Sequence, residues 1–289
     1  MRLRLFGLSF LAVALGLMSF GIRAQSRTID LGSVFDTAKN LVKSQSVGSM
    51  SEEEELSIGK EVVAATLGGY PPVKNPALQH RLNQIGVWIA LQSSRPELPW
   101  RFAAVQSPTI NAFAAPGGTI MVTTGMLSRV VNEAELACVL GHEIGHVTRR
   151  HHIGVLQKSL LVSAGASALN IQSKSGSSEE YRKRVISESK EIFTRGLDRS
   201  SEREADEDGV LLAARAGYDP AACLNFMQRL ASLKADTGAL AALYKTHPTA
   251  KERVTDVDKA LSKLKGASPG EGARPELTLN GTETGGKEK

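Results

Sequence analysis

Apolar residues recur at helical spacing over much of the chain, and the clearest example runs from Asn132 to Arg150. Asn132 is a suitable N-cap, and two glutamates in the first turn suit the positive end of a helix dipole. The stretch therefore predicts an amphipathic helix with one buried side. Gly141 and Gly145 are poor helix formers, so we expect another segment or a ligand to approach closely there. The apolar positions are Leu136, Val139, Leu140, Ile144 and Val147.

The same pattern predicts further helices and a small sheet. Ser51 with Glu54 matches a capping box and opens a helix, and Asn75-Pro76 opens another. We interpret the acidic run 52–55 as a solvated helix start. Strands are expected at 100–105 and 119–124, followed by a short helix and then by the helix 132–150. Beyond a break at 217–220, helices are expected at 221–232, 235–245 and 249–264. These elements predict a mainly helical α+β fold, with the sheet packed beside the helix 132–150.

Composition and charge exclude some classes of protein. Hydrophobic residues make up 42% of the 289 positions, which is ample for a core. Residues 1–24 have a positive start, an apolar run and a small-residue end, which predicts a secretory signal. Removing this leader takes away three basic residues and lowers the net charge from +5 to +2, so nucleic acid binding is not expected. No later stretch is apolar enough to span a membrane, and we expect export to the periplasm.

The rest of the chain divides into three further parts. We predict a lead-in over residues 25–50, one domain over 51–265 and a disordered tail over 266–289, which is rich in Gly, Glu, Lys and Thr. We read 172–178 as a loop and 181–197 as a partly exposed helix. Cys138 and Cys223 are the two cysteines. Export permits a disulfide between them, and two separate buried cysteines are the alternative.

The segment 141–146 reads GHEIGH and contains the pattern H-E-x-x-H. On a helix, His142 and His146 leave from one face and can each give a ring nitrogen to one Zn²⁺ ion. Glu143 lies at the flank, where it can reach a metal-bound water as a general base. His151 and His152 follow closely, and we expect them to cap the helix end or face solvent.

A catalytic zinc ion needs a third protein ligand, and the segment 200–209 offers carboxylates for it. Glu202 and Asp206 are four residues apart and share one helical face, whereas Glu204 points elsewhere. One carboxylate can bind zinc while the other orients a histidine through its free ring N–H. Spacing favours Glu202 over Glu204 only modestly. An ordinary acidic helix start is the alternative.

HEIGH followed by EREAD resembles the zinc metallopeptidase family of the CAAX prenyl endopeptidases, the heat-shock membrane protease and soluble periplasmic proteases. Two more stretches are similar, NAFAAPGGTIMVTTGML at 111–127 and THPTAKER at 246–253, so the resemblance covers about residues 50–262. It implies a zincin-like (gluzincin) fold with Glu202 as zinc ligand and Asp206 behind it. It also implies a strand beside the active cleft, and we expect Asn111, Ala112 and Phe113 there to bind substrate.

The chain also departs from some members of that family. It lacks the lipid-attachment cysteine of the outer-membrane lipoproteins, and it ends soon after Leu264, without the long helical-repeat domain that some members carry. The export signal makes it similar to the periplasmic members, which act in envelope protein quality control. The sheet's outermost strand is either a binding edge for an extended peptide or an ordinary core strand.

The resulting hypothesis is a zinc endopeptidase that cleaves misfolded envelope proteins, with one Zn²⁺ per chain and Glu143 as the base. His247 is the candidate donor to the oxyanion. It could instead fill the open zinc position and hold the enzyme latent, or be a simple turn residue. Arg253 is expected to brace this loop by pairing with Asp206 or another acid. The non-enzymatic alternative is a zinc-stabilised periplasmic chaperone.

Overall fold

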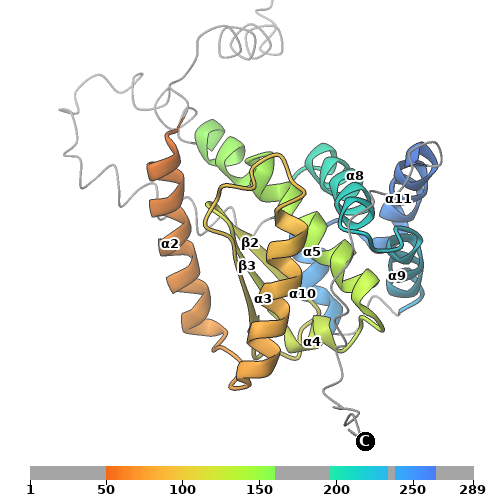
Figure 1. Cartoon of the computed structure of the whole chain (residues 1–289), viewed down its shortest axis with the longest axis horizontal. Coiled ribbons are helices and arrows are strands. Elements are labelled where there is room, and N and C mark those ends of the chain that lie inside the picture. The colour runs from red at the N-terminus through yellow and green to blue at the C-terminus, as the bar shows by residue number, and fades with distance from the viewer. Residues whose placement is uncertain (1–49, 160–195, 234–237, 265–289) are drawn as a thin grey trace, which may run out of the picture. The chain divides into compact units, whose positions relative to one another are not determined.

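The computed structural model describes residues 50–159, 196–233 and 238–264 (Figure 1). The leader 1–24, the loop 172–178 and the tail 266–289 lie outside these ranges. So do the lead-in up to residue 49 and the expected helix 181–197 up to residue 195. These parts of the domain plan remain predictions.

Two helices precede the sheet. Helix α2 spans Glu52–Gly69 and begins with the predicted capping box, in which Ser51 Oγ accepts from the backbone N–H of Glu54. Helix α3 spans Pro76–Ala90, and its N-cap is Asn75. The reading of residues 52–55 as a solvated start is wrong for Glu55. Its carboxylate is buried, accepts from Arg95 and lies 3.1 Å from Arg150, because the helix turns this position toward the core.

The sheet has three strands in the order β1-β3-β2. Strand β1 (Arg101–Val105) runs parallel to β3 (Thr119–Thr123), and β2 (Ala112–Ala115) pairs antiparallel with β3 at the edge. The turn at 116–118 joins β2 to β3, and Gly117 and Gly118 have positive φ angles of 79° and 99°. The apolar spacing predicted β1 and β3, whereas the short alanine-rich β2 carries little strand signal of its own.

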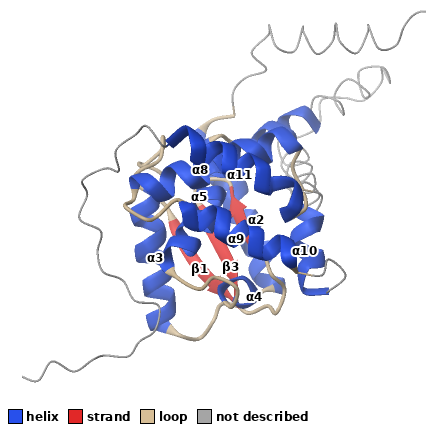
Figure 2. Cartoon of the chain, turned by 90° about the vertical axis from the view of Figure 1, so that its right-hand side faces the viewer, coloured by secondary structure: helices blue, strands red, loops and turns tan. Residues whose placement is uncertain are grey.

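Helix α5 (Glu133–Thr148) lies between the sheet and a group of later helices (Figures 1 and 2). It packs most extensively on α8 (Arg199–Arg215). A Cβ atom at Gly141 would lie only 3.0 Å from the Gly209 carbonyl oxygen, and one at Gly145 would lie 2.9 Å from Asp208 Cβ. The two glycines of the H-E-x-x-H helix therefore allow α8 to approach closely, as their poor helix propensity suggested.

Later helices are α9 (Ala221–Ser232), α10 (Gly238–Thr246) and α11 (Ala250–Leu264), the short α4 (Thr124–Leu127) precedes α5, and residues 151–159 are also helical. Cys138 and Cys223 form a disulfide that ties α5 to α9. In the described parts of the chain, no helix combines the length and apolar character that a bilayer crossing requires. The mainly helical fold with a small sheet beside α5 is confirmed.

Candidate metal centre

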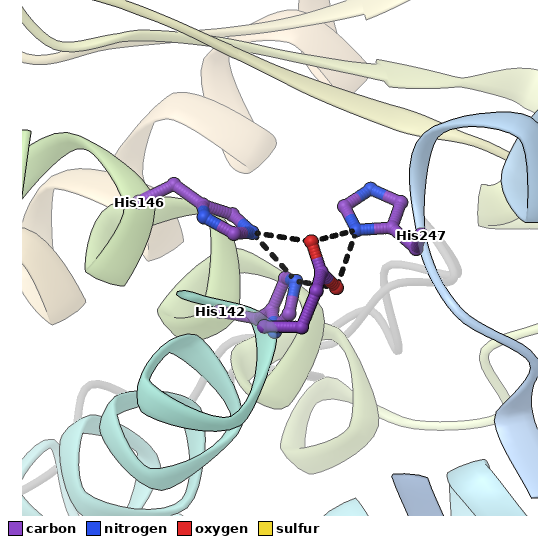
Figure 3. Close-up of side chains that lie close together, drawn as sticks. His142, His146 and His247 are labelled. Carbon is purple, nitrogen blue, oxygen red and sulfur yellow. Dashed lines mark hydrogen bonds and ion pairs between the residues drawn. The ribbon is translucent and has the colours of Figure 1, made fainter. Parts of the chain in front are cut away.

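The two histidines of α5 point to a common place, as Figure 3 shows. The Nε2 atoms of His142 and His146 lie 3.0 Å apart, and both side chains are buried. One helical turn separates them, so both rings leave from the same face of α5. The pair is therefore arranged to give two nitrogen donors to one ion.

Glu202 reaches the same place from α8. Its Oε2 lies 3.7 Å from His142 Nε2, and its Oε1 lies 3.5 Å from His146 Nε2. Asp198 caps α8 by accepting from the Ser201 backbone N–H, which begins the helix one turn before Glu202. The glycine contact between α5 and α8 brings this carboxylate to the histidines. Burial alone would raise the pKa of Glu202, but the nearby His247, His142 and Arg253 outweigh burial and lower it.

His247 belongs to the same cluster. It lies in the turn between α10 and α11, and its Nδ1 is 2.8 Å from Glu202 Oε2 (Figure 3). Potential ligand atoms of His142, His146, Glu202 and His247 all lie within 4.8 Å of one another. Burial would lower the pKa of His247, but the adjacent Glu202 carboxylate raises it. His247 is thus not a turn residue facing solvent.

A carboxylate supports His142 from behind. Asp206 Oδ1 lies 3.1 Å from the Nδ1 of His142, and Asp206 is buried. Arg253 of α11 donates to both carboxylate oxygens of Asp206, which is the pairing expected from the sequence. Burial would raise the pKa of Asp206, but Arg253 outweighs burial and holds it well below its usual range. Asp206 therefore stays ionised and orients the His142 ring.

A histidine lies behind His146, and the expectation that His151 caps the helix or faces solvent is wrong. The Nδ1 atoms of His146 and His151 are 2.9 Å apart, and the His151 side chain is only 8% exposed. Helix α5 ends at residue 148, and after the turn His151 points back toward the cluster. His152 is half-buried, and the loss of solvation, together with His247 nearby, lowers its pKa to about 3. Helical periodicity could not place either ring, because α5 ends before them.

Comparison with known proteins agrees with this geometry. The profile of peptidase family M48 matches residues 76–261. The chain belongs to peptidase family M48. A beta-barrel assembly-enhancing protease of Yersinia pestis is 30% identical over 232 residues, which are 75% of this chain and 46% of that protein. The family resemblance inferred from HEIGH and EREAD is thereby confirmed.

Further relatives extend the same assignment. The beta-barrel assembly-enhancing protease of Escherichia coli K12 is 27% identical over 76% of this chain and 46% of its own length. The mitochondrial metalloendopeptidase OMA1 of Arabidopsis thaliana is 34% identical over 157 residues, 54% of this chain and 30% of that protein. The chain spans about half the length, or less, of these curated relatives. It is a member of the M48 metallopeptidase family, and its cluster of His142, His146, Glu202 and His247 could hold a metal ion.

Glu143 sits at the edge of this M48 centre. It is buried, and burial raises the pKa of its carboxyl group, although the neighbouring histidines oppose that rise. Its Oε1 lies 4.0 Å from His247 Nε2, so the two side chains face each other across the centre. The carboxyl lies beside the cluster and is not one of its four potential ligands.

The segment expected to bind substrate lies beside Glu143. Ala112 and Phe113 of β2 line a recess together with Glu143 and His247. Asn111 is buried, and its backbone N–H donates to Thr123 Oγ1, which ties the start of β2 to the end of β3. Its side-chain Oδ1 has no hydrogen-bond partner among the described residues. The structure thus brings Ala112 and Phe113 to the M48 centre, while Asn111 anchors their strand.

Proposed function

We propose that the chain is a zinc-dependent endopeptidase in which His142, His146 and Glu202 hold the ion and Glu143 is the general base. The observation that carries the proposal is the convergence of two α5 imidazoles and an α8 carboxylate, with distances of 3.0, 3.5 and 3.7 Å between their donor atoms. Tetrahedral Zn²⁺ with bonds of about 2.0–2.2 Å separates its ligand atoms by about 3.3–3.6 Å. The donor set fits zinc, and the three distances lie within about 0.3 Å of that range.

The chemistry follows from the surrounding side chains. Zinc, when bound, acts as a Lewis acid toward a peptide carbonyl and lowers the pKa of a coordinated water. Glu143 accepts the proton of the attacking water and passes it to the leaving amine. Asp206 keeps the His142 ring in the tautomer that presents Nε2.

The substrate lies along β2 in this proposal. Strand β2 is an edge strand, and its residues line the recess that holds Glu143 and His247. An extended peptide that pairs with this edge would bring its backbone carbonyl past the metal centre. Substrates are polypeptides, and the name of the Yersinia pestis relative points to β-barrel proteins. With the predicted secretory leader, this supports cleavage of misfolded envelope proteins in the periplasm.

The exchange Glu143→Gln tests the base directly. It keeps the side-chain volume and removes the proton acceptor, so casein cleavage should fall by about 10²-fold to 10⁴-fold while one zinc per chain stays bound. Zinc content and fluorescent-casein hydrolysis are measured on the same preparation. Glu53→Gln, on the exposed face of α2, is the matched control and should behave as wild type. A chelator should stop wild-type cleavage and zinc should restore it. Undiminished cleavage by the Glu143→Gln variant would refute the assignment.

His247 favours a second form of the same proposal, a latent protease. Its Nδ1 lies among the candidate ligands, 2.8 Å from Glu202, where the ring could occupy the fourth position of the ion. His247→Ala separates the two roles in the casein assay. Faster cleavage indicates that the ring blocks the centre. Cleavage slower by about 10²-fold to 10³-fold indicates a donor to the oxyanion.

A further inference from the structure

His151 is the inner member of a chain of polar contacts that leads from the centre to the surface. Its Nδ1 lies 2.9 Å from the Nδ1 of His146, and its Nε2 lies 3.2 Å from Glu204 Oε2. Arg149 Nη1 in turn lies 3.3 Å from the same Glu204 oxygen. The His151 side chain is 8% exposed, whereas that of Glu204 is 48% exposed. This series of contacts is therefore buried at its metal end and exposed to water at its Glu204 end.

If an ion binds at His146 Nε2, the proton positions along this series of contacts are determined. His146 presents Nε2 to His142 and Glu202, so binding an ion there leaves the ring proton on Nδ1. That Nδ1–H can donate only to an unprotonated nitrogen, and the atom facing it is His151 Nδ1. His151 must then carry its own proton on Nε2, where it donates to the Glu204 carboxylate. All donors point outward from the centre, and each donor has an acceptor.

The backbone after α5 is shaped to make this contact. Arg150 has a φ angle of 56°, and it is the one non-glycine residue with positive φ among the described residues. This region is sparsely populated by side chains other than those of Gly, Asn and Asp, so the surroundings must hold it. Arg150 Nη2 donates to the Met50 carbonyl, and its Nε lies 3.1 Å from the buried Glu55 carboxylate. A further helical segment, residues 151–159, begins directly after Arg150, and His151 at its start lies against His146.

We propose that His151 is a positioning residue for the metal ligand His146. It fixes the orientation and tautomer of that ring by accepting its Nδ1–H, and Glu204 fixes the tautomer of His151. The inference rests on the proposed zinc site and assigns to this residue the part that Asp206 plays for His142. Partners of this kind commonly change metal affinity by about tenfold to a hundredfold.

Zinc affinity of the full chain, measured by competition with a chromophoric chelator, tests the proposal. His151→Phe keeps a ring of similar size and removes the acceptor, so zinc should bind about tenfold to a hundredfold more weakly. His151→Asn places an amide oxygen near the position of Nδ1, so affinity should return to within about threefold of wild type. His80→Phe, the same exchange at an exposed histidine of α3, is the matched control.

The outcomes separate a positioning role from simple packing. Weak binding by the Phe variant together with recovery in the Asn variant supports the proposal. Wild-type affinity in the Phe variant, or equal losses in both variants, overturns it. Thermal unfolding of the zinc-free proteins checks that the variants fold. If the Phe variant does not fold, Glu204→Leu replaces it. It removes a half-exposed acceptor and should weaken zinc binding by about threefold to tenfold. Unchanged affinity there overturns the proposal too.

This measurement needs no substrate. A chain that bound zinc as predicted but cleaved no protein would remove the proposed peptidase mechanism and leave the role of His151 intact. Conversely, active enzyme with unaltered zinc affinity in the His151 variants would remove the positioning role alone.

Discussion

The two histidines of α5 receive their support from unlike surroundings. Behind His142 lies the carboxylate of Asp206, which is buried and held by the buried Arg253. Behind His146 lies the imidazole of His151, whose outer partner Glu204 is half exposed. Helix α8 supplies an acid to each support, and a third, Glu202, to the centre between them. One support is a buried ion pair, and the other is an imidazole whose outer partner is a half-exposed carboxylate.

Because of this difference, we expect the two supports to affect different properties, namely folding stability and zinc affinity. An unpaired charge in the interior is costly, so the Asp206–Arg253 pair must be complete for the chain to fold well. The His146–His151 contact involves neutral groups, and its outer end is solvated. We therefore expect changes behind His142 to lower stability strongly, and changes behind His146 to act mainly on zinc affinity.

The largest effect should come from Asp206→Ala. The exchange leaves the Arg253 guanidinium buried without its carboxylate, which should lower the free energy of unfolding by about 3–5 kcal/mol. Chemical denaturation of the zinc-free protein measures this loss. Adding Arg253→Leu to Asp206→Ala removes the stranded charge, so the double variant should recover part of the stability. If the single variant is as stable as wild type, the contrast between the two supports does not hold.

The smallest effect should come from Asp198→Ala at the start of α8. Asp198 accepts from the Ser201 backbone N–H, so its loss should cost about 1 kcal/mol of unfolding free energy at pH 7. Helix α8 carries the acids of both supports, so Asp198→Ala should affect both. It should therefore lower zinc affinity by the same factor in the wild-type protein and in a His151 variant. A zinc-affinity loss that depended on His151 would show that the cap acts on one support only.

The same residue gives a pH dependence with a definite sign. The hydrogen bond from Ser200, with that from Ser201, lowers the pKa of Asp198 to about 2, below its ordinary value of 3.8. A carboxyl with a depressed folded-state pKa contributes stability above the unfolded-state pKa, and the contribution is lost as the pH falls through the folded-state pKa. The stability difference between wild type and Asp198→Ala should therefore be full above about pH 4 and shrink toward pH 2. A difference that grew on acidification would contradict this assignment.

The sequence predicted the candidate metal ligands and Asp206, but it did not predict that His151 contacts His146. His142, His146, Glu202 and Asp206 lie at spacings of four residues on helices, so periodicity alone places each pair on one face. Family resemblance then selected Glu202 over Glu204. The contact between α5 and α8 was indicated only indirectly. Gly141 and Gly145 are poor helix formers, which suggested that another segment packs closely against them.

The features that sequence reasoning missed depend on tertiary contacts or on backbone turns. Glu55 resembles three solvated neighbours, and only its packing against Arg95 and Arg150 distinguishes it. Strand β2 is short and rich in alanine, so pairing with β3 defines it rather than its own composition. His151 follows a residue with positive φ, and such a turn at an arginine has no sequence signal.

The most direct test of zinc binding by His142, His146 and Glu202 is an anomalous difference map at the zinc absorption edge. The crystals would be of the wild-type chain grown with zinc. We predict one strong peak per chain, about 2.0–2.2 Å from the Nε2 atoms of His142 and His146 and from a carboxylate oxygen of Glu202. A peak bound elsewhere, or one that excludes the Glu202 carboxylate, would contradict the account.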